Sequence, residues 1–294
     1  MITIYTPTYN RAQCLGHLYQ SLMNQTDLNF EWLIVDDGST DETRQIVEKF
    51  KADGVLKIRY IHKENGGVNS VMDCAAQNTE NEIIWRVDSD DSIKENAVEQ
   101  IYANWHLVAH DDSLVGLVFL SEDRDGTLVG KHPFNETFKT NFFDYQACYG
   151  ASGDRAEVCK TRIMKEYPFP SFPGEKFCPE GLMWNRVAQK YGAIYIPQVI
   201  HIRNVESGDA ISRRIVETLK KNSMGSLSYY ELLNMCKSRK IKLLYYLKNS
   251  ILFWRYALSD TKLRFSQKLG MVPLSAFIGI VVAIPLLILD NIKK

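Results

Sequence analysis

The feature that most constrains the fold is an alternation of short apolar runs with helical patterns along roughly the first hundred residues. The apolar runs lie near residues 2–6, 32–35, 56–61 and 83–87, and the segments between them carry apolar residues at helical spacing. Strands that alternate with helices through short connections form right-handed βαβ units, which build a mostly parallel sheet covered by helices on both faces. We therefore predict an α/β fold for this part of the chain.

A cluster of polar residues follows each of these predicted strands. The clusters lie at residues 6–11, 36–40, 65–67 and 88–91. In an α/β sheet, ligands bind outside the carboxyl ends of the strands, where such clusters meet. The sequence therefore predicts one ligand site at a shared edge of the sheet.

The composition excludes several other classes of protein. The 294 residues are 45% hydrophobic and 24% charged, with 17 Gly and 9 Pro, which rules out a disordered, collagenous or coiled-coil chain and a polytopic membrane protein. The 35 Lys and Arg balance the 35 Asp and Glu, so no net charge draws the chain to nucleic acid. The six cysteines are scattered without metal-site spacing and the N-terminus has no signal-peptide pattern, so we expect reduced thiols and a cytoplasmic location.

The second half of the chain is less regular. Asp125-Gly126 predicts a hairpin turn, and residues 130–180, rich in aromatic residues and proline, are expected to form an irregular loop that shapes the substrate site. From Ile211 onward the pattern is helical almost to the end. The remaining predicted elements are helices at 95–108 and 180–191 and strands at 114–120 and 194–202.

An acidic trio, Asp88, Asp90 and Asp91, follows the fourth predicted strand. Two carboxylates at i and i+2 on an extended chain project to the same side. They can hold a hard divalent cation through oxygen ligands while open coordination positions accept a diphosphate. The alternative is a strand-to-helix turn capped by aspartate.

Two residues near the first two strand ends are candidates for binding a nucleobase. The carboxylate of Asp36 can accept a hydrogen bond from the ring N–H of uracil or a similar base, whereas for Asp37 we favour turn and cap chemistry. Tyr9 can stack on the base, the alternative being a partly buried core tyrosine. The chain has no G-x-G-x-x-G after the first strand and no G-x-x-x-x-G-K-S/T, which disfavours NAD-dependent dehydrogenases and P-loop enzymes.

Four blocks of this sequence resemble the family-2 glycosyltransferases of the GT-A fold. The blocks are TIYTPTYNR at 3–11, VDDGSTDET at 35–43, NGGVN at 65–69 and VDSDD at 87–91, and they occur in the family's order and at its intervals. The resemblance covers residues 1–120 firmly and 150–215 more loosely. It implies an inverting transfer of a sugar from a nucleotide-diphosphate donor, such as a UDP-sugar, to an acceptor hydroxyl in bacterial polysaccharide assembly.

The resemblance also implies roles for individual residues. The residues that would bind the donor are Thr6, Tyr9, Asp36, Asn65, Gly67 and Asp88. Asp88 and Asp90 would form the D-x-D pair, with Mg²⁺ or Mn²⁺ held mainly by Asp90, where the cation would stabilise charge on the departing nucleoside diphosphate. Asp91 would either bind as well or cap the turn.

An inverting transfer needs a carboxylate that removes the proton from the acceptor hydroxyl. In the family this base comes from a later acidic motif, often Glu-Asp, that opens a helix. The corresponding segment is 173–184, where Glu180 is followed by Gly181 in place of Asp. We predict Glu180 as the base and Glu175 as the second candidate, the alternative for either being an acidic residue that complements a helix dipole.

A later polar set is linked to the site by resemblance. A segment near residues 208–212 is expected to fold over the diphosphate, and Arg213 can pair with phosphate in bidentate fashion. His201 is a candidate for an additional metal ligand, although a core or edge histidine is the favoured interpretation.

The C-terminal region carries charge mostly of one sign. Residues 237–268 contain nine Lys or Arg and one Asp, whereas residues 1–236 contain 24 Lys or Arg and 33 Asp or Glu. Apolar residues alternate with these cations, a pattern typical of a helix lying on an anionic membrane, with Tyr245, Tyr246, Trp254 and Tyr256 near the headgroups. Residues 271–289 lack charge and approach the ~20 residues that span a bilayer. We favour in-plane contact of residues 240–290 over a spanning anchor or a buried helix at a homo-oligomer interface.

These patterns together define the predicted organisation. A GT-A catalytic domain at 1–220 comprises a nucleotide-sugar-binding half at 1–120 and an acceptor and base half at 121–220, and a helical extension at 221–294 contacts the membrane. The acceptor would be a glycan or a polyprenyl-diphosphate-linked saccharide, met at the inner face of the plasma membrane by a peripheral or C-terminally anchored protein. Two alternatives are a catalytically silent nucleotide-sugar-binding subunit and a nucleotidyl- or sugar-phosphate transferase on a similar sheet.

Overall fold

The computed structural model describes residues 1–204, 215–236 and 240–292, with side chains as far as residue 288. The chain divides into two compact units. Unit 1 comprises Met1–Asn141, Ala151–Pro168 and Lys190–Gly208, and unit 2 comprises Phe142–Gly150, Phe169–Gln189 and Asp209–Lys294. The division at residue 220 that the sequence pattern indicates stays a prediction.

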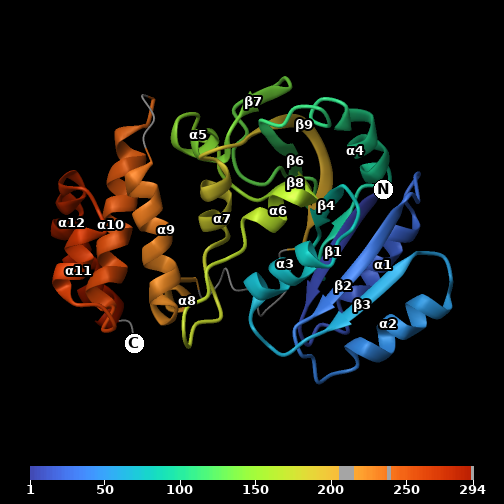
Figure 1. Cartoon of the computed structure of the whole chain (residues 1–294), viewed down its shortest axis with the longest axis horizontal. Helices are drawn as coiled ribbons and strands as arrows, with labels where there is room; N and C mark the ends of the chain where they lie inside the picture. The colour runs from blue at the N-terminus through green and yellow to red at the C-terminus, as the bar shows by residue number, and fades with distance from the viewer. Residues whose placement is uncertain (205–214, 237–239, 293–294) are drawn as a thin grey trace. The chain divides into compact units, whose positions relative to one another are not determined.

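The described part of unit 1 contains one nine-stranded sheet. Its strands are β1 (Ile2–Thr8), β2 (Phe30–Asp36), β3 (Ile58–His62), β4 (Ile83–Arg86), β5 (Ser92–Ile93), β6 (Leu114–Asp123), β7 (Phe138–Thr140), β8 (Arg155–Lys160) and β9 (Gly192–Arg203). Figure 1 shows the sheet, whose order is β3-β2-β1-β4-β8-β6-β9-β5, with β7 paired to β9.

The first four strands run parallel, as the sequence predicts. β1 lies between β2 and β4, and β3 pairs with β2. The register pairs Thr8 with Asp36 and Asp36 with His62, so the carboxyl ends of these strands meet at one edge of the sheet. The predicted α/β fold is confirmed, and the polar clusters that follow the strands lie along this edge.

The second half of the sheet is mixed rather than parallel. β8 is antiparallel to both β4 and β6, and β9 is antiparallel to β5 and β7 but parallel to β6. β7 and β8 both lie within residues 130–180, the segment predicted to be irregular. The predicted turn at Asp125-Gly126 is confirmed, because Asp123 N–H donates to the carbonyl of Thr127 at 2.8 Å across it.

Helices pack against both faces of the sheet. They are α1 (Leu15–Met23), α2 (Thr43–Ala52), α3 (Val68–Gln77), α4 (Ala97–Trp105) and α6 (Thr161–Glu166). Apolar residues of α1 and α4 join one core cluster with Trp32 and Trp85, whereas α3 packs with α6. All seven residues of β2 are buried, which requires cover on both faces.

Unit 2 is helical over its described residues. Its elements are α5 (Phe142–Ala147), α7 (Glu180–Val187), α8 (Ile215–Lys221), α9 (Ser223–Met235), α10 (Leu243–Ser259), α11 (Phe265–Gly270), the 3₁₀ helix η2 (Leu274–Phe277) and α12 (Ile278–Ile292). Figure 1 shows α9, α10 and α12 packed along one another, and their buried side chains form a second apolar core. The helical C-terminal region expected from the sequence is therefore present.

Two aromatic residues of α10 lie elsewhere than predicted. Trp254 and Tyr256 are buried inside unit 2, so their predicted placement among lipid headgroups is wrong. The indole N–H of Trp254 donates to the carbonyl of Ala276 at 2.9 Å, and the ring of Tyr256 stacks on that of Tyr230 with centroids 5.5 Å apart. Packing against η2 and α9 therefore accounts for both aromatic side chains.

The uncharged segment 271–289 is divided between structural elements. Its residues enter η2 and then α12, which carries Pro285 in its interior. Within residues 1–204, 215–236 and 240–292, none of the helices has the length and hydropathy that crossing a membrane demands.

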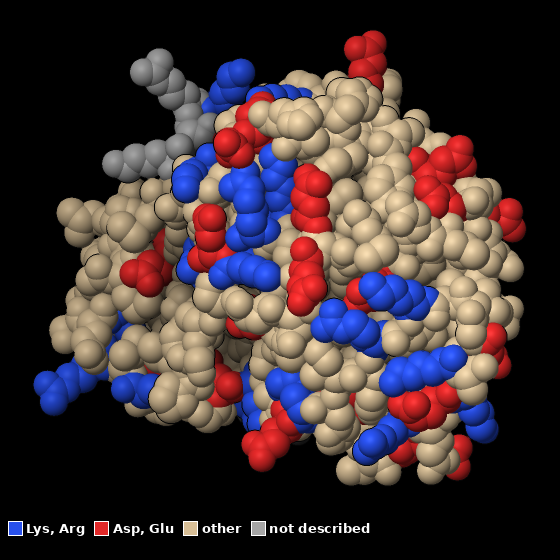
Figure 2. Space-filling view, turned by 45° about the vertical axis from the view of Figure 1, so that its right-hand side comes forward, with Lys and Arg blue, Asp and Glu red and all other residues tan. Residues whose placement is uncertain are grey.

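The charged side chains are interspersed on the face that Figure 2 shows. Lys and Arg lie beside Asp and Glu there rather than in separate areas. Ion pairs of unit 1 include Lys57 and Arg59, which both pair with Glu31, and Lys51, which pairs with Glu48.

Candidate donor-binding site

The loops that follow β1 and β2 are joined by hydrogen bonds at the strand-end edge. Asn10 N–H donates to Ser39 Oγ at 2.8 Å, and Asn10 Oδ1 accepts the N–H of Thr40 at 2.8 Å. Asn10 has a φ of 50°, a left-handed conformation that asparagine tolerates better than most residues. These contacts fix the position of Tyr9 and Arg11, the residues on either side of Asn10.

Asp37 fixes the loop that follows β3. Its Oδ1 accepts the N–H of Gly66 at 2.9 Å and the ammonium of Lys63 at 2.7 Å, and its Oδ2 accepts the N–H of Gly67 at 2.7 Å. The side-chain amide of Asn65 donates to the backbone carbonyl of Asp37 at 2.9 Å. Asp37 thus has the turn-forming role expected for it, and it brings Asn65 and Gly67 to the end of β2.

Gly67 occupies a backbone conformation that only glycine adopts without strain. It precedes α3 with φ 86° and ψ 164°. We expect Gly67→Ala to cost about 1–3 kcal/mol, which lowers the melting temperature by several degrees in a domain of this size. Gly16→Ala is the matched control, because Gly16 is helical and an added Cβ there meets nothing within 4 Å. Differential scanning calorimetry of both variants tests this, and an unchanged melting temperature for Gly67→Ala would contradict it.

The predicted base-binding residue Asp36 is buried at the end of β2. Its Oδ1 accepts the N–H of Ser39 at 2.8 Å, and its Oδ2 accepts the hydroxyl of Tyr60. Burial and this hydrogen bond raise the pKa of Tyr60. Both carboxylate oxygens of Asp36 are therefore engaged, and Tyr60 is a neighbour that no sequence motif pointed to.

Thr6 and Tyr9, both predicted to bind the donor, have different surroundings. Thr6 is buried in β1, where its Oγ1 accepts the indole N–H of Trp32 at 2.9 Å. Tyr9 is 48% exposed at the strand-end edge, so the alternative of a core tyrosine is wrong. Thr8, which we did not single out from the sequence, has a buried hydroxyl without a hydrogen-bond partner in the described part of the chain.

Each carboxylate of the D-x-D pair is bound to an arginine. Arg86 binds Asp88 through two bonds, Nε to Oδ1 at 2.6 Å and Nη2 to Oδ2 at 3.0 Å. Arg11 Nη1 donates to Asp90 Oδ2 at 3.0 Å. Burial lowers the pKa of Arg11, but the charges and hydrogen bonds of Asp90 and Cys14 together outweigh it, so the pKa of Arg11 is raised overall. Neither arginine was assigned a role from the sequence, although Arg11 ends the first of the four blocks.

Asp91 ties the D-x-D loop to the last long strand. Its Oδ2 lies 3.0 Å from His201 Nε2 on β9, and its Oδ1 accepts the N–H of Asn204 at 2.8 Å. Burial raises the pKa of Asp91, and the hydrogen bond and charge of His201 partly offset that rise. The other ring nitrogen of His201 lies 3.0 Å from Ser121 Oγ, so His201 is a buried residue at the strand edge with both nitrogens engaged.

The carboxylates of the D-x-D loop suit a cation that takes its other ligands from substrate phosphates and water. No group of three or more His, Cys, Asp or Glu side chains among the described residues is arranged to hold a metal by itself. Mg²⁺ and similar hard cations are commonly bound by one or two carboxylates together with substrate phosphates and water. Asp90 binds Arg11 through Oδ2 only and is 17% exposed, which leaves its Oδ1 as a ligand atom. The residues present therefore fit such an ion.

In unit 2, the two predicted base candidates have different surroundings. Glu180 is half-buried and begins α7 directly after Pro179, as the sequence predicts. The side chain of Glu175 is 1% exposed and accepts the N–H groups of Met224 and Gly225, each at 3.0 Å, and it also pairs with Lys262. Glu175 therefore stabilises the N-terminus of α9, where an acidic side chain complements the helix dipole.

Packing explains why Gly181 stands where the family often has Asp. A Cβ added at Gly181 would lie 2.7 Å from the ring of Tyr229 on α9. A side chain at this position would require the tyrosine ring to move. The residues predicted to cover the diphosphate, 208–212 and Arg213, lie outside the described residues.

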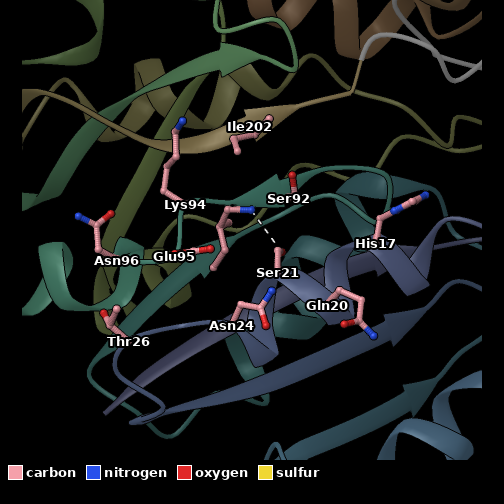
Figure 3. A pocket seen from close by; sticks show the side chains of 11 residues that line it. His17, Gln20, Ser21, Asn24, Thr26, Ser92, Lys94, Glu95, Asn96 and Ile202 are labelled. Atoms are coloured by element: carbon pink, nitrogen blue, oxygen red, sulfur yellow. Dashed lines mark hydrogen bonds between the residues drawn. The ribbon is translucent and has the colours of Figure 1, made fainter.

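A separate hollow of about 740 Å³ lies on unit 1 beside β5 (Figure 3). Figure 3 shows His17 and Gln20 of α1, with Asn24 directly after that helix, on one side and Ser92 and Lys94 on the other. Ser21 Oγ accepts the backbone N–H of Ile93 at 3.3 Å and joins the two sides. None of the predicted site residues lines this hollow, although Ser92 directly follows Asp91.

The architecture defines the class of protein. The chain matches the crystal structure of S. aureus TarS 1–349 in complex with UDP-GlcNAc at a TM-score of 0.62 and 19% identity, over 96% of this chain and 88% of that chain. It matches the mannosyltransferase PcManGT from Pyrobaculum calidifontis, in complex with GDP-Man and Mn²⁺, at a TM-score of 0.56 and 16% identity, over 97% and 79% of the two chains. The fold is that of the GT-A glycosyltransferases.

The sequence comparisons identify the family. Residues 3–164 match the family described as Glycosyl transferase family 2, and the chain belongs to this family. A relative is the minor teichoic acid biosynthesis protein GgaA of Bacillus subtilis (strain 168), which is 25% identical over 230 residues, 72% of this chain and 49% of that protein. This chain spans less than half the length of the first curated relatives, 42% and 49%.

Proposed function

We propose that the chain transfers a sugar from a nucleotide-diphosphate donor, a UDP-sugar, to a hydroxyl of a glycan or lipid-linked saccharide, with inversion at the anomeric carbon. The observation that carries the proposal is the pair of arginine–carboxylate contacts at the strand-end edge, Arg86 with Asp88 and Arg11 with Asp90. Carboxylates for a cation and arginines for phosphate are what a metal–diphosphate group needs. The nucleotide sugars bound to TarS and PcManGT support this donor class.

The D-x-D carboxylates would hold Mg²⁺ or Mn²⁺, with Asp90 as the main ligand. When bound, the cation supplies Lewis-acid stabilisation of the charge on the leaving nucleoside diphosphate. The Mn²⁺ in the PcManGT complex supports this choice. With Asp90 bound to a cation, Arg11 would lose this carboxylate partner, and its guanidinium would be available to bind the diphosphate.

The nucleoside would lie between Tyr9 and the Asn65–Gly67 turn. The exposed ring of Tyr9 offers a stacking surface, and glycine at 67 lets the backbone approach the donor closely. Each carboxylate oxygen of Asp36 accepts one hydrogen bond, from Ser39 or from Tyr60, and can accept a second one from the base. The Tyr60 hydroxyl would then lie beside the base.

We assign Glu180 as the general base. Its carboxylate would remove the proton from the acceptor hydroxyl as that oxygen attacks the anomeric carbon opposite the leaving diphosphate. The position of Glu180 at the start of α7 and its half-buried state support the assignment over Glu175, whose oxygens are occupied by the start of α9 and by Lys262.

A donor screen with the purified chain tests the proposal. We expect one UDP-sugar to be hydrolysed slowly to UDP and free sugar when Mn²⁺ is present and not when EDTA is present. Binding of the same donor without any hydrolysis would identify a silent binding subunit. Release of UMP in place of UDP would identify a sugar-phosphate transferase. Donor affinity that is equal with Mn²⁺ and with EDTA would contradict the role of Asp90.

Removal of the Tyr9 ring is expected to weaken nucleotide binding. Stacking of one base on an aromatic ring contributes about 1–3 kcal/mol, so Tyr9→Ala should raise the dissociation constant for UDP with Mn²⁺ by roughly 5- to 150-fold. Tyr9→Phe is the matched control, because it keeps the ring and should bind like the wild type. Isothermal titration calorimetry measures both, and equal affinity of Tyr9→Ala and the wild type would remove Tyr9 from the site.

We further propose that the reaction takes place in cell-surface polysaccharide assembly at the cytoplasmic face of the plasma membrane. The name of the relative GgaA, a teichoic acid biosynthesis protein, supports such an acceptor class. A polyprenyl-diphosphate-linked acceptor would stay in the bilayer, so the chain would have to meet it at the membrane surface.

A further inference from the structure

The outward face of α12 is apolar as far as residue 288. The exposed large apolar residues of η2 and of α12 up to residue 288 are Leu274, Ile278, Val281, Val282, Ile284 and Ile288, with 47% to 81% of each exposed. Ile278, Val281 and Val282 follow the three- and four-residue spacing of a single helix face, and Ile288 continues it. Single exposed apolar residues are ordinary on a protein surface, but a contiguous stripe marks an interaction surface.

The opposite face of α12 fixes this orientation. Gly279 packs directly on α10, where an added Cβ would lie 2.5 Å from the carbonyl oxygen of Ser250. Ala276 and Ala283 are fully buried. Because the small residues hold α12 against α10, the larger aliphatic side chains are left on the outside.

The beginning of α10 continues the same surface. Leu243 and Leu244 are 70% and 81% exposed, and the hydroxyl of Tyr246 is hydrogen-bonded to Ser275, next to Leu274. Exposed lysines accompany these leucines: Lys242 precedes Leu243, and Lys248 lies one helical turn after Leu244. We call the stripe of η2 and α12 together with Leu243 and Leu244 the docking face.

We propose that the docking face lies on the surface of an anionic lipid bilayer. Residues 215–288 contain 11 Lys or Arg and three Asp or Glu, while residues 274–288, which form η2 and most of α12, carry no charge. Aliphatic side chains enter the acyl boundary as lysines beside them meet anionic headgroups. A second copy of the chain docked through the same face would bring two positively charged units together, which opposes association. The inference extends the proposed function, because it names the surface that would bring the chain to a lipid-linked acceptor.

Vesicle co-sedimentation of the whole chain, without nucleotide sugar, tests the docking face. We expect binding to vesicles that contain phosphatidylglycerol, weaker binding to phosphatidylcholine alone, and loss of binding at high salt. The double variant Leu274→Ser/Val281→Ser should lower the partition coefficient by about tenfold or more, because two aliphatic side chains no longer leave water. Lys242→Gln/Lys248→Gln should lower it by roughly fivefold per lysine on anionic vesicles and leave binding to phosphatidylcholine unchanged.

A matched surface variant separates this effect from general exposure of leucine. Leu128→Ser in unit 1, where the leucine is 50% exposed, should bind vesicles like the wild type. Thermal unfolding confirms that each variant is folded. Wild-type vesicle binding by Leu274→Ser/Val281→Ser would overturn the proposal, as would a solution dimer that this variant dissociates. UDP titration of the same variants keeps the outcome separate from the proposed catalysis, which these substitutions should not change.

Discussion

Glu180→Gln is expected to reduce donor turnover by about 10²–10⁴-fold, the contribution typical of a general base. The amide keeps the shape of the side chain but cannot accept the proton of the attacking hydroxyl or water. Donor affinity should stay at the wild-type value, because Glu180 acts on the acceptor. Turnover is measured as UDP release with Mn²⁺ from the donor that the screen identifies, and affinity by calorimetry.

Glu175→Gln is the comparison that separates a base from a helix-start contact. The Glu175 carboxylate accepts two backbone N–H groups at the start of α9 and pairs with Lys262, so its loss should lower the melting temperature. Turnover by the folded fraction should remain within a few-fold of wild type. If Glu180→Gln kept full turnover while Glu175→Gln lost it at an unchanged melting temperature, the base would be Glu175.

The parts of the fold that could be predicted are those with a local signal. β1 to β4 are short apolar runs bounded by polar turns, and each was recognisable without knowledge of its neighbours. β8 was not, because Arg155, Glu157 and Lys160 interrupt its apolar residues. It is a central strand only because β4 and β6 pair with it on either side, and pairing between distant segments leaves no mark in a single short window.

The burial of Trp254 and Tyr256 was unpredictable for a related reason. A basic segment with interspersed aromatic residues has the same sequence pattern whether its aromatic side chains contact lipid or a neighbouring helix. The partners that decide the matter, Ala276 and Tyr230, lie about twenty residues or more away on other elements. Leu243 and Leu244, in contrast, are exposed. If this region contacts a membrane, exposed aliphatic side chains such as these make the contact, and Trp254 and Tyr256 do not.

In the candidate site, too, the motif residues were predictable and their binding partners were not. An acidic cluster at a strand end predicted Asp88 and Asp90, but the arginines that bind them come from β4 itself and from the loop after β1. Asp36 and Asp37 are adjacent in sequence, and only the structure distinguishes their contacts. Asp37 organises the glycine turn, whereas Asp36 is bonded to Tyr60 from β3.

Asp90→Asn is expected to abolish most metal-dependent turnover, by about 10²–10³-fold, because a neutral amide is a poor ligand for a hard cation and several kcal/mol of charge stabilisation are lost. The Mn²⁺ affinity measured in the presence of UDP should fall in parallel. Asp112→Asn is the matched control, since Asp112 is a surface carboxylate, 94% exposed, that also pairs with an arginine, Arg162. It should leave both quantities unchanged.

Arg11→Gln separates the two functions that the pairing with Asp90 combines. The guanidinium competes with a cation for Asp90, so its removal should strengthen Mn²⁺ binding without nucleotide by a few-fold, the scale of a partly exposed ion pair. The same variant should bind UDP with Mn²⁺ about tenfold or more weakly, because a charged hydrogen-bond donor to the diphosphate is lost. A variant that weakens both equally would place Arg11 in a purely structural role. Stronger Mn²⁺ binding together with weaker UDP binding in one variant is expected only if the same arginine pairs with the Asp90 carboxylate in the free protein and with the substrate phosphate in the complex.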